Sequence, residues 1–440
     1  METVKIKHLE AIEVLDSRGF PTVEVEMQAT SADRLAQVRA IVPSGASTGE
    51  GEALELRDGD EKRYWGKGVL RAVKNVNEKI APAILKKEFA KQSLLDDLIR
   101  EIDGTENKQK LGANAILAVS LAFSRASAEL SDRPLFQFLA ETFETKANTL
   151  PVPLMNILNG GAHADNGLNL QEFMIVPVGF DRFHDALRAG SEVFHALKKG
   201  LKTKGLSTSV GDEGGFAPTF SGERPHEQAI EVILEAIQTA GYKAGKEIFL
   251  ALDCASSEFC QKDSRGEWIY QFENRSLTSS QMIQLYDEWL DSFPIISIED
   301  GLSEHDWKGW TELTKKIGNH CQLVGDDLFV TNAKTLSKGI KNQAGNSILI
   351  KLNQIGTVTE TLETMKLALQ SKYSCVVSHR SGETEDTFIA DLAVATNCGQ
   401  IKTGSLCRTD RTAKYNQLLR IEKRLGKQAR FAASGAFQGL

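Results

Sequence analysis

Short apolar runs in the second half of the chain end, one after another, in a charged or ionisable side chain. The terminal residues are Asp253, Glu299, Asp326, Lys351, His379 and Lys402. From Glu299 onward they are 27, 25, 28 and 23 positions apart, which fits one strand, one helix and two short loops. Because the carboxyl ends of parallel strands meet on one face of a barrel, the spacing predicts that these side chains share one pocket.

Three of these residues, Asp253, Glu299 and Asp326, are carboxylates. Brought together without a partner they would repel one another, and the pKa of each would rise. A divalent cation would relieve that repulsion, and a set of oxygen ligands without cysteine or histidine suits Mg²⁺ better than Zn²⁺. The alternative is that each carboxylate caps a helix or pairs with a surface lysine, but their position at three strand ends favours a metal site.

Basic residues at the same strand ends could bind and deprotonate an anionic substrate. Lys351 follows the apolar run ILI, so we expect a buried stem. A metal ion and Lys402 nearby would disfavour its ammonium form and make it a usable base. An ion pair with one of the acids is the alternative interpretation. Lys402, Arg380 and Ser381 would supply the cations and donors that an anion needs, or they could form a solvated surface patch.

Two loops add candidate groups. The segment SVGDEGGFAP places Glu213 before a Gly-Gly pair, where the backbone can approach a ligand closely. The segment NGGAHADN presents His163 from a similar turn, and Gln171 and Glu172 open the strand-like run FMIVPVG. A single loop histidine is more often exposed to solvent than functional, and spacing alone does not rank these loops.

The elements that would position these groups form an α/β barrel. Strands that are buried on both faces read as continuous apolar runs, as Ile248–Asp253 and Ile295–Glu299 do. Repeated βα units without a glycine-rich dinucleotide fingerprint favour a closed barrel over an open Rossmann sheet. We therefore predict a C-terminal barrel domain over residues 149–440.

The N-terminal part of the chain has a different pattern. The segment TVEVEM alternates like a half-buried strand, PSGASTGE is a loop of small residues, and residues 112–130 are typical of a buried helix. Strands followed by helices predict a smaller α+β domain over residues 1–138. We place the domain boundary at the prolines within residues 148–153, which interrupt helical character.

Composition and charge limit the class of protein. The chain of 440 residues has a formal net charge of −7 and six cysteines, none in a C-x-x-C pair. Without a basic stripe, this charge argues against a nucleic-acid binder. The start METVKIKHLE lacks the apolar segment of a secretory leader, and the longest apolar runs are too short to span a bilayer. We expect a cytoplasmic protein with reduced thiols that acts on a small molecule.

Nine segments, in this order, resemble those of the enolases, and the resemblance runs from about residue 6 to residue 426. The segments are PSGASTGE, NGGAHADN, SVGDEGGFAP, ISIEDGL, VGDDLFVTN, ILIKLNQIGT, SHRSGETEDT, GQIKTGS and AKYNQLL. The resemblance implies an irregular eight-stranded barrel whose opening elements depart from strict βα alternation. It also implies a homodimer or a dimer-based homo-octamer, between which the sequence does not choose.

The activity implied by the resemblance is that of a phosphopyruvate hydratase, a lyase of glycolysis and gluconeogenesis that reversibly dehydrates 2-phosphoglycerate to phosphoenolpyruvate on two Mg²⁺ ions. Lys351 would abstract the proton beside the substrate carboxylate, and Glu213 would assist loss of hydroxide. The residues implied to hold the first ion are Asp253, Glu299 and Asp326. Ser47, in the mobile loop of residues 44–48, would ligate the second ion, which arrives with substrate.

The resemblance also implies supporting roles. Glu172 and His379 would act beside Lys351 and Glu213 among the catalytic groups. The groups that would contact the substrate carboxylate or phosphate are His163, Gln171, Arg380, Ser381 and Lys402. Enolase-superfamily sites commonly combine a lysine or histidine base with Mg²⁺, so this pairing is known for the superfamily.

Two other functions compete with this interpretation. An enolase-superfamily enzyme that acts on an unphosphorylated acid would share the three carboxylates, but it would not be expected to carry SGAST or SHRSGETEDT. A non-catalytic surface-binding protein would be expected to have lost Lys351 or Glu213, and both are present. The tail AASGAFQGL also lacks the terminal lysine through which some enolases bind plasminogen at cell surfaces.

Overall fold

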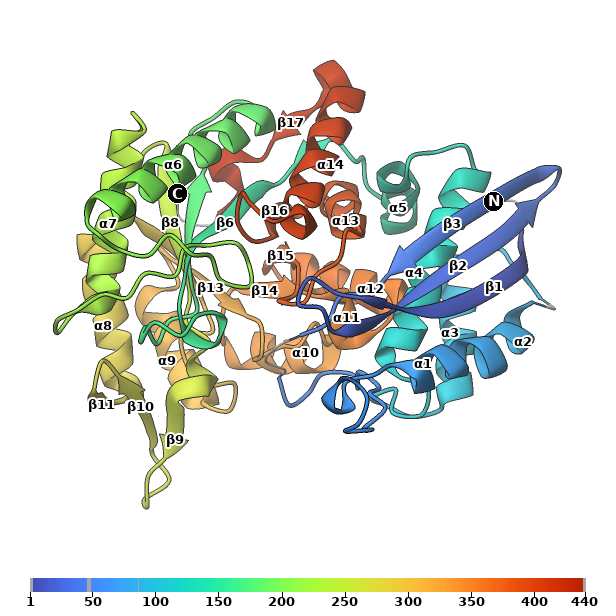
Figure 1. Ribbon diagram of the computed structural model, residues 1–440, viewed down its shortest axis with the longest axis horizontal. Coiled ribbons are helices and arrows are strands. Elements are labelled where there is room, and N and C mark those ends of the chain that lie inside the picture. Colours follow the sequence, from blue (N-terminus) through green and yellow to red (C-terminus); the bar gives the residue numbers. More distant parts are fainter. Residues whose placement is uncertain (1–2, 46–48, 86, 438–440) are drawn as a thin grey trace.

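The structure is a computed structural model that describes residues 3–45, 49–85 and 87–437. Figure 1 shows a barrel with surrounding helices, coloured from green to red, beside a blue N-terminal sheet with its own helices. The predicted fold class is therefore confirmed: a closed eight-stranded α/β barrel with a smaller N-terminal α+β domain. Ser47, predicted to ligate a second Mg²⁺, lies outside the described residues.

The N-terminal part is built on an antiparallel sheet in the order β3-β2-β1-β4. Its strands are β1 (Val4–Leu15), β2 (Pro21–Ser31), β3 (Arg34–Ile41) and the short β4 (Glu88–Phe89). Along β2, buried and half-buried residues alternate, because one face of the sheet packs on a helix. The helices are α1 (Leu70–Asn75), α2 (Ala81–Ile84), α3 (Gln92–Asp103), α4 (Ala113–Leu130) and α5 (Leu135–Phe143).

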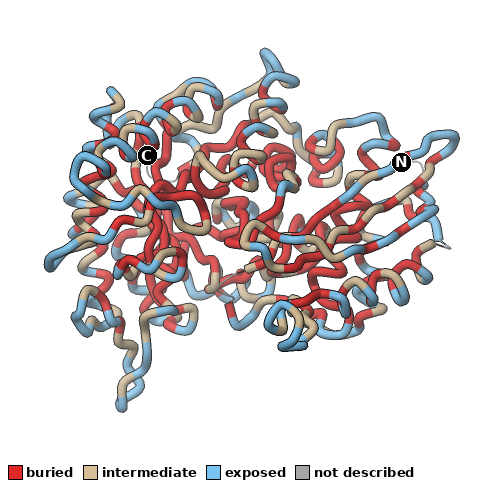
Figure 2. The backbone as a smooth tube through the Cα atoms, in the orientation of Figure 1, coloured by how far each residue is buried: buried red, intermediate tan, exposed pale blue. Residues whose placement is uncertain are grey.

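Helix α4 confirms the buried helix predicted from the alanine- and leucine-rich segment of residues 112–130. Almost every one of its residues is buried, because one side packs on β2 and β3 and other sides contact neighbouring helices. Small alanine side chains allow this close approach on several sides. The sheet and α4 together make the N-terminal part a compact support beside the barrel (Figure 2).

The barrel closes in the strand order β12-β13-β14-β15-β16-β6-β7-β8. Neighbouring strands are parallel except where β7 pairs antiparallel with β6 and with β8. Two helices follow β7 before β8 begins, so the opening is ββαα, and the simple βα pattern begins with β8. The strands are β6 (Val152–Asn159), β7 (Glu172–Pro177), β8 (Ile248–Asp253), β12 (Ile295–Glu299), β13 (Gln322–Gly325), β14 (Ser347–Ile350), β15 (Ser374–Ser378) and β16 (Gly399–Lys402).

Helices surround this barrel, and a small side sheet extends from it. The helices are α6 (Phe183–Thr203), α7 (Pro225–Thr239), α8 (Ser279–Ser292), α9 (Trp307–Ile317), α10 (Ala333–Asn342), α11 (Leu352–Ile355), α12 (Val358–Gln370), α13 (Phe388–Thr396) and α14 (Thr409–Leu425). The side sheet consists of β9 (Cys260–Lys262), β10 (Trp268–Phe272) and β11 (Arg275–Thr278). It lies between β8 and α8 in the chain, which explains the long interval between Asp253 and Glu299.

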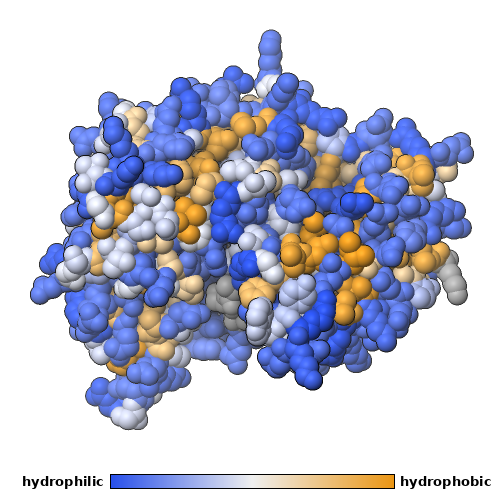
Figure 3. Space-filling view, viewed as in Figure 1, coloured by the Kyte–Doolittle hydropathy of each residue, from blue (hydrophilic) through white to orange (hydrophobic). Residues whose placement is uncertain are grey.

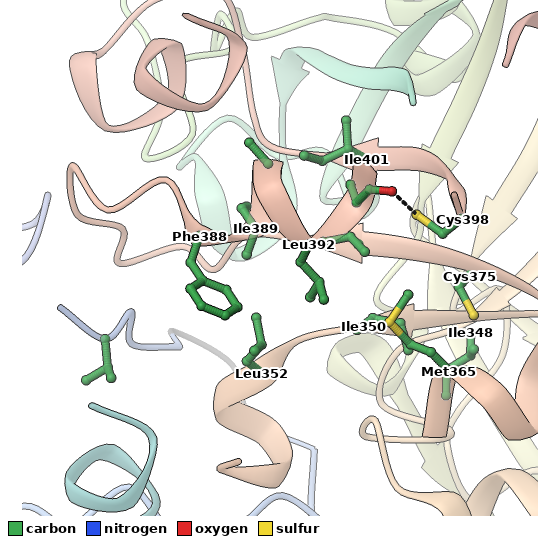
Figure 4. Packing of buried hydrophobic residues seen from close by; sticks show 14 of the residues in the cluster. Ile348, Ile350, Leu352, Met365, Cys375, Phe388, Ile389, Leu392, Cys398 and Ile401 are labelled. Carbon is green, nitrogen blue, oxygen red and sulfur yellow. Dashed lines mark hydrogen bonds between the residues drawn. The ribbon is translucent and has the colours of Figure 1, made fainter. Parts of the chain in front are cut away.

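Both faces of the barrel strands are buried, as their continuous apolar runs predict. Leu349 of β14 belongs to the apolar cluster inside the barrel, whereas Ile348 and Ile350 belong to the larger cluster outside it. Figure 4 shows Ile348 and Ile350 near Met365 of α12. Most of the free cysteines, including Cys375, are buried in this packing, and burial raises the pKa of the Cys375 thiol.

Of the two prolines used to place the domain boundary, Pro151 lies between two strands and Pro153 lies within one. Pro153 belongs to β6, opposite Ile401, and β5 (Thr149–Leu150) pairs with β17 (Arg430–Phe431) near the C-terminus. Helix α5 spans the predicted limit at residue 138. The limits 1–138 and 149–440 therefore stay predictions.

The surface in Figure 3 is mainly hydrophilic, with apolar residues gathered in places. Among the described helices, not one combines the length and the apolar character needed to cross a membrane.

Candidate active site

The mouth of the barrel brings together the residues predicted from the strand ends. Asp253, Glu299 and Lys402 are the last residues of β8, β12 and β16, and Asp253 and Glu299 are partners in the β8–β12 register. One pocket contains nearly all predicted site residues: His163, Gln171, Glu172, Glu213, Asp253, Asp326, Lys351, His379, Arg380, Ser381 and Lys402. Glu299 joins it through a contact with Lys402. The cavity among them is about 20 Å³, room for roughly one water molecule, so side chains must move to admit a substrate.

Lys402 lies at the centre of the carboxylates and is 2% exposed. Its Nζ lies 2.8 Å from Oδ2 of Asp253, 2.9 Å from Oε1 of Glu299 and 3.0 Å from Oε1 of Glu172. Burial lowers the pKa of Lys402. The surrounding carboxylates together raise it by more than burial lowers it, so the pKa lies well above its ordinary value. Burial and then Asp253 raise the pKa of Glu299 well above its ordinary value, despite Lys402. A single ammonium group thus offsets only part of the negative charge.

Lys351 is paired with Asp326 in the structure, as the alternative interpretation of this lysine expects. Its Nζ donates to Oδ2 of Asp326, whose Oδ1 accepts a hydrogen bond of 2.8 Å from Nε2 of Gln354. Burial lowers the pKa of Lys351, but its acidic neighbours, Asp326 first and then Glu299, together raise it more, so the pKa lies above its ordinary value. We expected a disfavoured ammonium form; the ion pair that we gave as the alternative is what the structure contains.

Glu213 and Glu172 lie close together across the barrel mouth from Lys351. Lys351 follows β14, whereas Glu172 begins β7 and Glu213 contacts Asn156 of β6. Possible ligand atoms of His163, Glu172 and Glu213 all lie within 4.8 Å of one another. Burial and the Glu213 carboxylate raise the pKa of Glu172 well above its ordinary value. Burial also raises the pKa of Glu213, but His379 and His163 lower it more, to well below its ordinary value. These opposite directions favour a proton on Glu172 over one on Glu213.

Asn156 of β6 orients Glu213, a contact that no pattern in the sequence predicts. Its Nδ2 donates to Oε2 of Glu213 at 3.1 Å, while Nε2 of His379 lies 3.4 Å from Oε1. Burial lowers the pKa of His379 to about 3. His163 is buried rather than exposed, contrary to the usual behaviour of a loop histidine, and its Nε2 lies 3.2 Å from Oγ of Ser381.

Several buried polar atoms that line this pocket or lie beside it have no hydrogen-bond partner among the described residues. They are His163 Nδ1, Gln171 Oε1, Glu172 Oε2, His379 Nε2, Asn156 Oδ1 and both side-chain polar atoms of Asn159. An unsatisfied buried polar group costs about 1–3 kcal/mol, and native structures contain few of them. Their concentration in one pocket indicates a site built for a polar ligand.

The N-terminal part contributes to the same mouth. Arg380 pairs with Glu52 through two contacts, Nη1 to Oε2 at 2.9 Å and Nη2 to Oε1 at 3.2 Å. Ser44 and Gly382 exchange backbone hydrogen bonds of 2.8 and 2.9 Å. A guanidinium that donates two hydrogen bonds to a carboxylate can bind a phosphate with the same two donors. The Arg380–Ser381 segment, which we call the anion-binding edge, thus carries donors of the kind that an anion would need.

Carboxylate oxygens for a divalent cation are present, although the tightest group is not the predicted one. Among the described residues, the closest acidic group is Asp300, Asp326 and Asp327, whose ligand atoms lie within 4.8 Å of one another. Asp300 accepts the backbone N–H groups of Asp326 and Asp327 at 3.0 and 2.8 Å, so it also shapes the turn after β13. In the predicted set, lysines hold the oxygens of Asp253, Glu299 and Asp326. An all-oxygen set with excess negative charge fits a hard cation such as Mg²⁺.

Comparison with family models decides the relationship of the chain. Residues 6–139 match the enolase N-terminal domain, and residues 147–439 match the enolase C-terminal TIM barrel domain. The chain belongs to the enolase family. It is accordingly a lyase of the enolase superfamily, whose members typically use Mg²⁺, and the acidic groups at the mouth of the barrel are consistent with such an ion.

Proposed function

We propose that this member of the enolase family catalyses the reversible dehydration of 2-phosphoglycerate to phosphoenolpyruvate, in glycolysis and gluconeogenesis. The observation that carries the proposal is the placement of a base and an acid pair across the barrel mouth. Lys351 follows β14, whereas Glu213 is held by Asn156 of β6, and β15 and β16 lie between these strands. A substrate between them meets an amine on one side and carboxyl groups on the other, which elimination of water requires.

Lys351 is the proposed base. To accept the proton on the carbon beside the substrate carboxylate, Lys351 must first be neutral, and its ion pair with Asp326 must be broken. That carbon-bound proton is weakly acidic, because its removal adds a second negative charge to an existing anion. The cationic residues Lys402 and Arg380 lie near enough to oppose this charge as it develops.

Glu213 is proposed to assist loss of the hydroxyl group, with Glu172 as its source of a proton. The pKa of Glu172 is raised by burial and by Glu213, which favours a proton on Glu172, and possible ligand atoms of the two residues lie within 4.8 Å of each other. Transfer from Glu172 to Glu213, and from Glu213 to the departing oxygen, would release water. Asn156 and His379 keep Glu213 in place during this transfer.

Asp253, Glu299 and Asp326 are proposed to hold the first Mg²⁺, and Ser47 a second. When bound, Mg²⁺ supplies positive charge that stabilises the substrate carboxylate as it becomes more negative. The residues of this chain bind and orient the ion through the same oxygens that Lys402 and Lys351 contact here.

The anion-binding edge favours a phosphorylated substrate over the unphosphorylated acid of the competing interpretation. Arg380 has a carboxylate partner with two contacts, and Ser381 and His163 are neighbours within hydrogen-bond distance. This arrangement is proposed to bind the phosphate, with Gln171 and Lys402 toward the substrate carboxylate. Closure of the loop of residues 44–48 is proposed to exclude bulk water from the reaction.

The test is a direct assay of folded protein with Mg²⁺. After addition of 2-phosphoglycerate we expect ultraviolet absorbance to grow at the band of phosphoenolpyruvate. Absence of that signal, together with dehydration of an unphosphorylated hydroxy acid, would favour the superfamily alternative. Absence of turnover with every such acid would favour the non-catalytic alternative.

A further inference from the structure

Arg411 of α14 is a fully buried arginine behind the pocket, and no role has been given to it above. One guanidinium nitrogen, Nη1, donates to Nδ1 of His379 and, at 2.6 Å, to the backbone oxygen of Arg380. The other, Nη2, donates to the backbone oxygens of Ser381 at 2.6 Å and Asp212 at 3.2 Å. Burying a charge is costly unless it is paired and hydrogen-bonded. Nε of Arg411 lies 2.8 Å from Oδ2 of Asp410, and the other two nitrogens bond to the two segments that carry Glu213 and the anion-binding edge.

The contact with His379 determines where the imidazole carries its proton. A guanidinium has only donors and stays charged, so Nδ1 of His379 must accept and cannot carry hydrogen. A neutral ring then carries its proton on Nε2. That nitrogen is buried, lies 3.4 Å from Oε1 of Glu213 and makes no hydrogen bond among the described residues. The ring therefore presents an N–H to the pocket beside the acid.

The path of the Arg411 side chain depends on a neighbouring glycine. A Cβ at Gly404 would lie 2.7 Å from Cδ of Arg411 and 3.0 Å from the backbone oxygen of Glu213, and the φ of Gly404 is +77°. A side chain at that position would displace the guanidinium or the Glu213 segment. The space behind the pocket is thus shaped around an arginine that joins the two segments.

We propose that Arg411 is a positioning residue that fixes His379 in the neutral form with its proton on Nε2, and aims this N–H at the group that reacts beside Glu213. The identity of that group rests on the proposed function, whereas the proton position on His379 does not. Lysine would not replace Arg411 fully, because its single ammonium cannot reproduce the planar set of donors.

The test is nitrogen NMR of protein with ¹⁵N-labelled histidine, in which His379→Gln identifies the His379 signals by their loss. In the wild type, Nδ1 is expected to resonate as an unprotonated nitrogen that accepts a hydrogen bond, and Nε2 as a protonated one. Arg411→Gln should give a mixture of both neutral forms. With 2-phosphoglycerate it should lower kcat by about 10- to 100-fold, as loss of a group that orients an active-site histidine commonly does, with a smaller effect on KM.

Two further variants keep the inference decidable. Arg411→Lys should recover part of kcat and part of the signal of the single form. Arg424→Gln, a change of an exposed arginine on the same helix, should leave spectrum and turnover unchanged.

A protonated Nδ1 in the wild type would overturn the inference, even if every Arg411 variant failed to fold. An unchanged His379 spectrum in Arg411→Gln would also overturn it, whatever the activity. If the wild type shows the expected spectrum but does not turn over 2-phosphoglycerate, the proposed function fails while the position of the proton stands.

Discussion

The two ends of the barrel both bury polar side chains, but they treat them in opposite ways. At the amino end, Nε2 of Gln322 donates to Oγ of Ser297 at 3.1 Å and to Oε1 of Gln400 at 2.9 Å. Oε1 of Gln322 accepts from Nε2 of Gln400 at 2.7 Å and from Oγ of Ser374 at 2.9 Å. The remaining N–H of Gln400 donates to the backbone oxygen of Ala436 at 2.9 Å. Both amides use all of their donors.

At the mouth, by contrast, charges exceed their partners and several polar atoms have none. His163, Gln171, Glu172 and His379 each leave a buried atom without a hydrogen bond among the described residues. The same barrel thus has a neutral network with all amide hydrogen bonds made at its amino end, and buried polar atoms without hydrogen bonds at its mouth. The difference teaches that burial of a polar group does not itself indicate function; the useful sign is a group of buried polar atoms that lack partners.

Removal of the proposed base should give the largest effect. Lys351→Met should lower kcat by about 10²- to 10⁴-fold, the range expected for loss of a general base. Steady-state kinetics with 2-phosphoglycerate and circular dichroism will separate loss of chemistry from loss of fold. Lys308→Met, on the exposed side of α9, serves as the control and should keep full activity. Full turnover by Lys351→Met would show that another group is the base.

Mg²⁺ should stabilise the mouth and restore activity. At a free concentration 100 times its Kd, the ion should raise the free energy of unfolding by about 2.7 kcal/mol relative to EDTA, if it binds the folded state alone. Asp253→Asn should lose most of this gain, whereas the exposed Asp33→Asn should keep it. Urea unfolding with and without Mg²⁺ measures both. Equal gains in the two variants would contradict the proposed ligand set.

A change at the amino end should affect stability without affecting chemistry. Gln322→Leu would leave donors and acceptors of Gln400 and Ser297 unpaired, at a cost of about 2 kcal/mol in the free energy of unfolding. Turnover per folded molecule should not change. Gln370→Leu, an exposed glutamine at the end of α12, is the matched control. A loss of kcat in Gln322→Leu comparable to that in Lys351→Met would break the distinction between the two ends.

Asp96 tests whether complete hydrogen bonding removes the cost of burial. Its carboxylate accepts from Gln92 at 3.0 Å and from the backbone and hydroxyl of Thr359 at 3.0 and 2.6 Å, yet burial raises its pKa to about 6. The folded state therefore binds this proton more tightly than the unfolded state, and the stability gained from it is lost as pH rises through 6. Between pH 5 and pH 8 the loss should be about 1.4 kcal/mol.

Asp96→Asn should lack this loss, so its free energy of unfolding should vary less with pH than that of the wild type. Urea unfolding at pH 5 and pH 8 provides the comparison, with the exposed neighbour Asp97→Asn as control. Parallel pH profiles for the wild type and Asp96→Asn would show that the hydrogen bonds already offset burial.

Much of the site could be predicted because it depends on local pattern plus barrel closure. Asp253, Glu299 and Lys402 each end an apolar run, and any closed parallel barrel brings such ends together. The pattern could not show which charges would pair, since Lys402 contacts carboxylates that are 103 and 149 positions away in the chain. The ion pair of Lys351 with Asp326, which we gave as the alternative, also depends on a contact between separate strand ends; the charge of Lys351 beside a metal ion stays a prediction.

Other residues carried no local signal. Asn156 lies within a continuous buried strand, Arg411 lies in a helix after the last barrel strand, and Glu52 lies in the N-terminal part. Each reaches the site through a contact between segments distant in the chain. The domain limits, the cytoplasmic location and the dimer or octamer stay predictions, because they depend on properties that the described residues do not test.

The reversed strand β7 changes how such a barrel should be searched for functional residues. Because β7 runs opposite to its neighbours, its first residue, Glu172, reaches the mouth, whereas its last, Pro177, lies at the far end beside Ile248. A survey that inspects only the residues after each apolar run would pass over this glutamate. At an inverted strand, the residue that reaches the mouth of the barrel precedes the apolar run. The direction of each strand therefore has to be known before catalytic residues can be sought in the sequence.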